Sequence, residues 1–450
     1  MATIHYARLD EFWRKEQKYD FLDQHGHVGT VDWQVLAPDK HHLWLTEGMH
    51  DEFETFLPMG TKEAKAGEGN AIFLTYGRGV ATSRDDWAFN FNHEYLAQNI
   101  KRMIGEYNDH VFRLSQLSSK PNIDNYVSYD NVKINWSRDL KLDLQRGRFA
   151  EFTESKIRKS IYRPFSKQYL FFDKILNEEV YQFPRFFPTT GTELENRVIC
   201  VVNEAQIPFS SQITNHIPCL HYGGRQTQCF PFYTYAEDGS NRRENITDWA
   251  LEQFRHQYAA VDADSTIENQ KSKIEKWDIF HYVYALLHHP DYRAKYAANL
   301  RRELPRIPLV EDFWAFAQAG ARLADLHVNY ETQPEYRLNW IENADKPLNW
   351  RVERMKLSKD KHSLLYNDFL TLAGIPPAVY AYKLGNRSAL EWIVDQYQVS
   401  VDKRSGIRND PNNPADPQAI VRLIGQVISV SVATVAIVNH LPALVIRPDR

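Results

Sequence analysis

The stretch HYGGRQTQCFPFYTYAEDGSNRREN, residues 221–245, separates a part of the chain rich in predicted strands from a part rich in predicted helices. Its aromatic run at 230–235 is typical of a strand, whereas the Asp-Gly, Ser and Asn residues of 236–245 favour turns. Before it, short apolar runs between polar turns predict further strands at 72–76, 127–129, 168–172 and 197–202. After it, apolar residues recur at three- and four-residue steps, which predicts helices. The stretch therefore indicates an α+β fold.

Helices are predicted on both sides of this boundary. One over 93–114 begins after Asn92, a good helix cap, and one over 388–397 begins with the capping-box pair Ser388 and Glu391. The others are expected at 9–22, 268–288, from Pro290, at 311–326 and from Asp416 onward. We expect a lobe with a mixed or antiparallel sheet and inserted helices, plus a helical lobe, in two to three subdomains. Their predicted limits are 1–60, 61–240, 241–332 and 333–450.

Composition excludes several classes of protein. Of 450 residues, 43% are hydrophobic and 25% are charged, which is ordinary for a folded chain and excludes wholesale disorder. The 54 basic and 58 acidic residues leave a net charge of −4, so any binding of nucleic acid has to come from local patches. Three cysteines and the lack of an apolar leader favour the cytoplasm. The apolar run 420–438 contains Arg422 and Gln426 and predicts a core helix, so no membrane partner is expected.

No complete active site can be assembled from the motifs. The chain has no Gly-x4-Gly-Lys-Ser/Thr phosphate loop, and its Pro376-Pro377 pair lacks the amide or acid that an amino-methylating site needs before it. A zinc site at His216, Cys219, His221 and Cys229 has no standard ligand spacing, so buried strand cysteines are the better interpretation. We therefore expect no catalytic residues, no metal and no cofactor in this chain.

A local basic patch is predicted between residues 138 and 167, where nine basic residues stand against four acidic ones. Such a patch attracts DNA phosphates without sequence preference. The candidate phosphate ligands are Lys141, Arg146, Arg148, Lys156, Arg158, Lys159, Arg163 and Lys167. The alternative is a salt-bridged surface with no ligand.

Two loops carry side chains that can form paired hydrogen bonds with base edges. The loop at 76–86 supplies Arg78, Thr82, Ser83 and Arg84, and the loop at 221–228 supplies Arg225, Gln226 and Gln228. Two glycines in the second loop permit a close backbone approach. For each loop the alternative is a tight turn without a ligand, and Asp85 and Asp86 could simply neutralise Arg84.

The sequence GRGVATSRDDWAFNF at 77–91 resembles the G-V-x-T-x-R-D-x-W-x-(Y/F)-N-F block of Type ISP restriction-modification enzymes. Further stretches resemble other blocks of the C-terminal specificity region of that family, in the same order. They lie at 161–173, 228–235, 279–309, 313–331 and 389–412. The resemblance extends over nearly the whole chain from about residue 30.

The resemblance implies that this chain is similar to the target-recognition end of a larger enzyme. In that family a nuclease, a helicase-like motor and an adenine-N6 methyltransferase precede this region. S-adenosylmethionine, ATP and Mg²⁺ would then belong to those domains, and residues 1–60 would be a helical connector toward the methyltransferase. Such a methyltransferase flips its target base, which leaves the choice of site to a domain that grips the duplex.

We therefore predict sequence-specific recognition of double-stranded DNA in the major groove, by a monomer, with the methyltransferase and helicase domains as partners in cis or in trans. Two alternatives stay open. One is a DNA-modifying enzyme with an unfamiliar active site. The other is a scaffold that docks on a methyltransferase without reading DNA.

Overall fold

The computed structural model describes residues 3–10, 13–39, 42–119, 121–258 and 274–448. It divides into two compact units, Met1–His50 and Asp51–Arg450. In the first unit, β1 (Ile4–Tyr6) pairs antiparallel with β2 (Gln34–Leu36), and the chain between them forms α1 (Lys15–His25) and a short 3-10 turn, η1 (Val28–Thr30). None of its described residues is buried, because so short a segment has too few apolar side chains to build a core.

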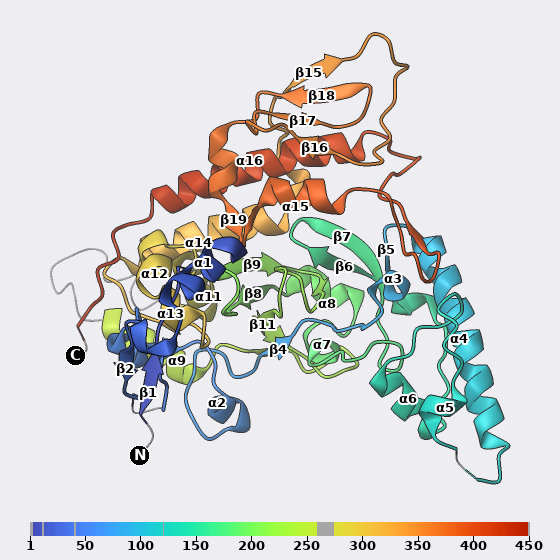
Figure 1. The fold of residues 1–450 in the computed structure, drawn as a ribbon, viewed down its shortest axis with the longest axis horizontal. Coiled ribbons are helices and arrows are strands. Elements are labelled where there is room, and N and C mark those ends of the chain that lie inside the picture. The colour runs from blue at the N-terminus through green and yellow to red at the C-terminus, as the bar shows by residue number, and fades with distance from the viewer. Residues whose placement is uncertain (1–2, 11–12, 40–41, 120, 259–273, 449–450) are drawn as a thin grey trace. The chain divides into compact units, whose positions relative to one another are not determined.

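Two four-stranded sheets form the β-rich part of the second unit. The first has the order β10 (Ile217–Pro218), β6 (Ile157–Arg163), β7 (Ser166–Phe171) and β5 (Phe89–Asn90), and its β10–β6 pair is parallel. The second has the order β4 (Gly77–Arg78), β11 (Gln228–Pro231), β8 (Val198–Val202) and β9 (Ser210–Thr214), and its pairs are antiparallel. In Figure 1 the strands β6 to β11 of these sheets are green, and β4 and β5 are blue. All residues of β8 and β9 are buried, so β8 has the unbroken apolar sequence VICVV rather than an alternating one.

The helix α4 (His93–Ser115) organises a separate hydrophobic core next to the first sheet. Its cap is the predicted one, because the Asn92 side chain accepts a hydrogen bond of 2.9 Å from the Tyr95 amide. Its buried residues recur at three- and four-residue steps and pack against α6 (Arg138–Gln145) and β7. Shorter helices accompany this part of the chain: η2 (Asp51–Thr55), α2 (Lys62–Ala66), α3 (Asp85–Ala88), α5 (Ile123–Tyr126), η3 (Glu154–Lys156), α7 (Phe183–Phe186) and α8 (Thr190–Glu195).

After the hairpin of β12 (Tyr233–Thr234) and β13 (Arg243–Glu244), the chain becomes helical, as predicted. The helices are α9 (Asp248–Tyr258), α11 (Lys276–Leu286), α12 (Pro290–Lys295), α13 (Ala297–Leu300) and α14 (Phe313–Val328). The helix predicted over 268–288 corresponds to α11, and its first part, up to 273, lies outside the described residues. β14 (Arg306–Ile307) pairs back onto β3 (Leu57–Pro58), so this part shares a core with residues from the start of the unit.

The C-terminal part adds an antiparallel sheet, which projects beyond α15 and α16 at the top of Figure 1. Its order is β15 (Asn339–Glu342), β18 (Leu370–Ala373), β17 (Ser363–Leu365) and β16 (Lys356–Leu357). The remaining elements are η4 (Tyr330–Thr332), η5 (Pro377–Ala381), the hairpin β19 (Lys383–Leu384) and β20 (Arg387–Ser388), α15 (Ala389–Gln396), the hairpin β21 (Ser400–Val401) and β22 (Arg408–Asn409), and α16 (Ala419–Asn439). The predicted capping box of α15 is present, with Ser388 and Glu391 bonded to each other's backbone amide.

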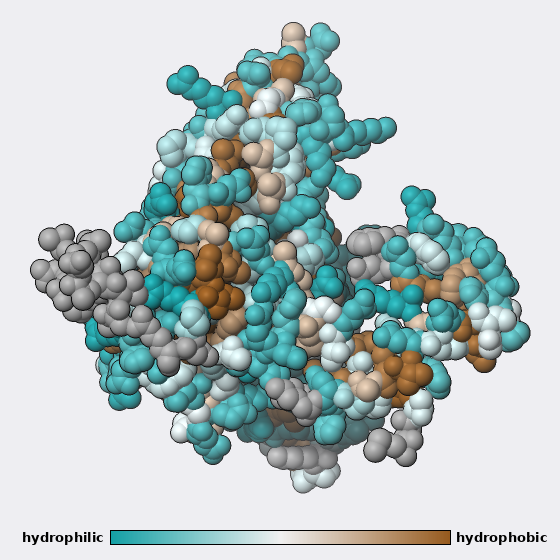
Figure 2. Space-filling model, turned by 90° about the vertical axis from the view of Figure 1, so that its left-hand side faces the viewer, coloured by the Kyte–Doolittle hydropathy of each residue, from teal (hydrophilic) through white to brown (hydrophobic). Residues whose placement is uncertain are grey.

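The helix α16 is long and apolar enough to span a membrane by length and composition, but 61% of its most apolar window is buried inside the structure. Ile420, Ile424, Val427 and Ile428 belong to the core shared with α15 and the C-terminal sheet, as predicted for a core helix. On the face shown in Figure 2 the surface is mostly polar, and apolar side chains gather in a few patches.

The α+β class predicted from the sequence is confirmed. Two predicted strands are wrong. Residues 72–76 contain only an isolated bridge from Phe73 to Ile246, and the strand β4 begins after them at Gly77. Residues 127–129 follow α5 without forming a strand. There the Ser128 carbonyl accepts a bond of 2.9 Å from the Trp136 indole rather than from a neighbouring strand. The predicted subdomain limits at 60, 240 and 332 stay predictions.

Candidate nucleic-acid interface

The two loops predicted to read bases lie side by side, because β4 and β11 are neighbouring strands. Arg78 is paired in register with Gln228, and the Gly79 amide donates a bond of 3.1 Å to the Thr227 carbonyl. A Cβ atom on Gly79 would lie 2.5 Å from the Cys219 carbonyl oxygen, so only glycine permits this approach. Each loop was predicted separately, and the pairing of β4 with β11 places them next to each other.

A cavity of about 320 Å³ opens where these loops meet. Its walls are residues 80–86 of the first loop, Cys219 and Leu220, which precede the second loop, His221 from that loop, Asn135, and Arg404 from the β21–β22 hairpin. The readout candidates Arg225, Gln226 and Gln228 do not line it. Ser83 is exposed in this wall and adopts a positive φ of 53°, which turns the chain sharply between Thr82 and Arg84.

The predicted readout residues divide into two groups by exposure. Arg78, Ser83, Arg225 and Gln226 are exposed, so their polar groups are accessible to a ligand. Gln228 is half-buried within β11. Thr82 and Arg84 are buried.

Arg84 is a structural residue in this fold, which corrects its predicted role in base readout. Its guanidinium donates to the Asn135 carbonyl at 3.0 Å, and also to the Leu176 carbonyl and the Ser137 hydroxyl. Burial lowers the pKa of Arg84 to about 10, so the side chain is still charged at neutral pH. With these three acceptors around it, the guanidinium joins distant loops rather than facing a base.

Thr82 is also turned inward, where its hydroxyl donates to the Asp85 carboxylate. Asp85 accepts a second bond, of 3.1 Å, from the Tyr162 hydroxyl and lies 3.8 Å from the Arg163 guanidinium. Asp85 therefore pairs with Arg163 and does not neutralise Arg84, as the sequence had left open. These contacts hold the base of the first loop in one conformation.

Charged groups at the mouth of the cavity influence one another. Burial raises the pKa of the Asp86 carboxyl, the charges of Asp402 and Asp85 raise it further, and Arg404 opposes them. Burial also lowers the pKa of His221, helped by the nearby Arg163. The mouth thus combines a cation, a carboxylate and an imidazole that is neutral at physiological pH.

Seven of the eight predicted phosphate ligands have a carboxylate partner. The pairs are Lys141–Asp124 at 2.6 Å, Arg146–Asp143 at 3.3 Å, Arg148–Asp143 at 2.9 Å, Lys156–Asp173 at 2.8 Å, Arg158–Glu193, Arg163–Asp85 at 3.8 Å and Lys167–Glu331 at 2.7 Å. Five of these carboxylates come from outside residues 138–167 and offset the local excess of positive charge. For these seven side chains the structure matches the salt-bridged alternative.

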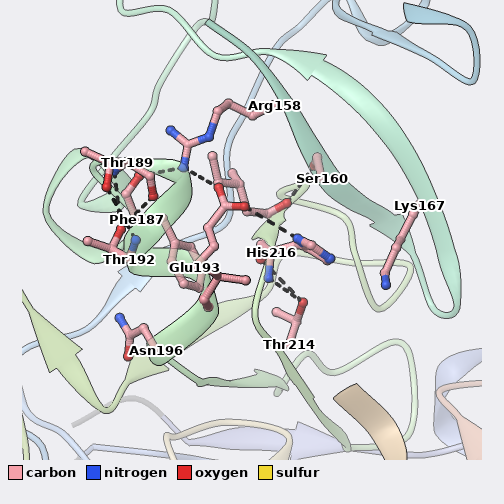
Figure 3. A network of polar contacts seen from close by, with 12 residues as sticks. Arg158, Ser160, Lys167, Phe187, Thr189, Thr192, Glu193, Asn196, Thr214 and His216 are labelled. Carbon is pink, nitrogen blue, oxygen red and sulfur yellow. Dashed lines mark hydrogen bonds and ion pairs between the residues drawn. The ribbon is translucent and has the colours of Figure 1, made fainter. Parts of the chain in front are cut away.

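Arg158 is removed from the surface altogether, which corrects its prediction as a phosphate ligand. Figure 3 shows the Glu193 carboxylate between the Arg158 guanidinium and the His216 ring, with Lys167 apart from this network. Arg158 also donates to the Phe187 carbonyl at 3.2 Å. Both members of the ion pair are buried, so Arg158 cannot contact a phosphate without unfolding this region.

Lys159 is the exception among the eight. It is exposed on β6, and within the described residues it forms no ion pair. Its ammonium lies 3.7 Å from the ring centroid of Tyr169, its cross-strand neighbour on β7. A cation held over an aromatic face keeps its charge available to a phosphate.

The sequence did not single out Asp86, Asn135, His221 or Arg404 as members of this site. Asp86 and His221 lie inside the two predicted loops, so their polarity could have indicated them. Nothing local points to Arg404, because it reaches the cavity from more than 180 residues farther along the chain.

The three cysteines are all free and buried. Cys200 and Cys229 are buried with their sulfur atoms 3.9 Å apart, and Cys219 accepts a contact of 3.2 Å from Arg163. In the part of the chain that the structure describes, no group of three or more His, Cys, Asp or Glu side chains could hold a metal ion.

Comparison with known proteins gives consistent matches. The family model of the Type ISP C-terminal specificity domain matches residues 71–423. One similar structure is a nuclease-deletion mutant of the Type ISP restriction-modification enzyme LlaGI, solved in complex with a DNA substrate mimic. Its sequence is 31% identical to this chain, and the two folds match with a TM-score of 0.85. The match covers 99% of this chain and 40% of the LlaGI chain. In the cryoEM structure of a DrdV–DNA complex, the matching protein is 32% identical in sequence to this chain, with a TM-score of 0.84. The match covers 99% of this chain and 44% of the DrdV chain.

The ATP-dependent Type ISP enzyme LlaBIII, bound to DNA, matches with a TM-score of 0.83 at 27% identity, over 96% of this chain and 27% of that one. This chain thus spans less than half the length of each of these three solved proteins. None of the curated proteins compared with it matches.

Proposed function

Because this chain belongs to the Type ISP C-terminal specificity domain family, we propose that it recognises a short, asymmetric sequence in double-stranded DNA. The solved relatives LlaGI, DrdV and LlaBIII are described as complexes with DNA or a DNA mimic. This chain matches the part of those proteins that the family model describes as a specificity domain. It would supply target choice for the modification and restriction activities of a larger enzyme.

One observation carries the proposal: the β4–β11 pairing joins two loops whose exposed side chains can recognise bases. Arg78 and Arg225 can donate paired hydrogen bonds to guanine, and Gln226 can pair with adenine. The buried contacts of Arg84 and Thr82 fix the first loop, which limits the entropy lost when DNA binds.

Partners follow from the same family membership. We propose that the chain works with methyltransferase and helicase domains, in cis or in trans, and that S-adenosylmethionine, ATP and Mg²⁺ are bound by those domains. We also propose that it acts as a monomer, since an asymmetric site needs no two-fold axis. A cytoplasmic location is supported by three cysteines that are all free and buried.

The test is selection of the purified chain on a random duplex library at about 100 mM salt, followed by sequencing of the bound pool. Enrichment of one short non-palindromic motif supports the proposal. Retention without enrichment, or no retention even at low salt, favours a docking scaffold. Cleavage or methylation of DNA by the purified chain alone would establish the enzyme alternative.

Arg225→Ala is expected to weaken binding to the selected site by about 1–3 kcal/mol and to relax the preference at one base position. The reason is that the variant lacks the two guanidinium N–H donors with which Arg225 would bond a base edge. The measurement is a titration against the selected duplex and its single-base variants. Arg185→Ala, which removes another exposed arginine, is the control and should bind as the parent chain does. An equal loss on all duplexes would show that Arg225 contacts phosphate instead.

Lys159→Ala is expected to weaken binding to all duplexes alike, because it removes one phosphate contact. The slope of log affinity against log salt concentration should flatten by about 0.9. Lys174→Ala is a suitable control, since Lys174 is exposed but paired with Glu237 at 2.7 Å, and its slope should stay near that of the parent chain. A change in base preference with an unchanged slope would contradict this assignment.

A further inference from the structure

The cavity beside the first reading loop is also lined by Arg404, which lies at the tip of the β21–β22 hairpin, residues 402–407. The tip has a defined turn, because the Asp402 carboxylate accepts from the Ser405 amide at 2.7 Å and from its hydroxyl at 2.6 Å. Gly406 completes the turn with a φ of +70°, a conformation that favours glycine. Lys403 and Arg404 are both exposed at this tip.

The hairpin is anchored to the same part of the fold as the first reading loop. The Asn90 side-chain Nδ2 donates to the Arg408 carbonyl at 3.0 Å, and the Phe91 backbone amide donates to the Asn409 Oδ1 at 2.9 Å. Ile407 is buried in the core around α4. Asn90 and Phe91 lie two and three residues after the end of α3, which carries Asp86, so these contacts join the hairpin to the chain just beyond α3.

Arg404 and Asp86 provide complementary chemistry at the mouth of the cavity. Both line it and both are exposed, and within the described residues neither forms an ion pair. They are near enough for the Arg404 charge to act on the Asp86 carboxyl. The Arg404 guanidinium has several N–H donors in a fixed planar arrangement, and the ionised Asp86 carboxylate has only acceptors.

This combination matches one base pair in the major groove. Guanine presents two acceptors there, N7 and O6, to which an arginine fork bonds bidentately, and the paired cytosine presents the N4 amino donor, which a carboxylate accepts. No other pair offers two adjacent acceptors on one base and a donor on its partner. Resting on the function proposed above, we propose that Arg404 and Asp86 together read one G·C pair of the target, with Arg404 on guanine and Asp86 on cytosine.

The test uses the full chain and the duplex motif selected from the library, with every base pair substituted in turn. Arg404→Ala and Asp86→Asn are each expected to weaken binding about 10- to 100-fold on the selected motif and to lose discrimination at the same G·C position. Arg404→Lys keeps the charge without the fork, so it should lose discrimination there while retaining affinity for non-target duplexes. Arg408→Ala in the same hairpin is the control, because Arg408 pairs with Asp410 at 3.2 Å.

The outcomes separate this proposal from the function on which it rests. Loss of preference at one shared G·C position supports it. A uniform loss for Arg404→Ala on all duplexes, or binding equal to that of Arg408→Ala, overturns it while leaving the recognition of DNA intact. If Arg404→Ala and Asp86→Asn lose base discrimination at two different positions, the assignment of both residues to one base pair is also overturned. If the parent chain selects no motif, both proposals fail.

Discussion

Glu193→Ala is expected to destabilise the fold by about 3–5 kcal/mol, because it leaves the Arg158 guanidinium buried without its carboxylate. The remaining acceptors, such as the Phe187 carbonyl, cannot offset the lost charge pair. The measurement is the shift of the denaturation midpoint, followed by circular dichroism.

Two further variants make this expectation specific. Glu195→Ala on the same helix breaks only the exposed pair with Arg242, which solvent screens, so its denaturation midpoint should stay close to that of the parent chain. The double variant Arg158→Met and Glu193→Leu replaces the buried pair with apolar groups and should recover most of the lost stability. A Glu193→Ala midpoint equal to that of Glu195→Ala would refute the structural role given to Arg158.

Gly320→Ala is expected to be at least as damaging, with a loss of about 3 kcal/mol or more, at the upper end for overpacked cores. Gly320 lies on α14 where that helix meets α11, and an added Cβ would lie 1.8 Å from the His281 carbonyl oxygen. The obstacle is backbone in the middle of α11, so no side-chain movement can relieve the clash. Thermal and chemical denaturation of the variant would measure the loss.

The matched control is Gly105→Ala on the exposed side of α4, where nothing lies within 4 Å of the added Cβ. This substitution should stabilise the helix by roughly 0.5–1 kcal/mol, since alanine loses less conformational freedom than glycine on folding. Should Gly320→Ala behave like Gly105→Ala, the close contact between α11 and α14 would be wrong.

Prediction from the sequence succeeded where the signal is local. The cap of α4 at Asn92, the capping box at Ser388 and the periodicity of α14 all depend on residues within one or two helical turns. Such local signals predict the same helix start whatever the rest of the chain packs against it. The strands predicted at 72–76 and 127–129 are wrong because a short apolar run is compatible with several conformations.

The structure brings the two predicted loops together, but the sequence did not indicate which of their side chains turn inward. Arg84 and Arg225 look equally suited to base readout in the sequence, yet one is buried and the other exposed. Arg84 turns inward because three acceptors, from residues 51 to 92 positions away, happen to surround it. The same holds for Lys167, whose carboxylate partner lies 164 positions along the chain.

By itself the sequence determined the α+β class, the start of the principal helices, the lack of recognisable catalytic motifs and the likeness to a specificity domain. These depend on composition, periodicity and motif order, which are properties of the chain alone. Only the tertiary structure decided which cations are neutralised, which loop residues are accessible, and that Arg404 joins the cavity. Burial and ion pairing are relations between distant segments, so they exist only after the chain has folded.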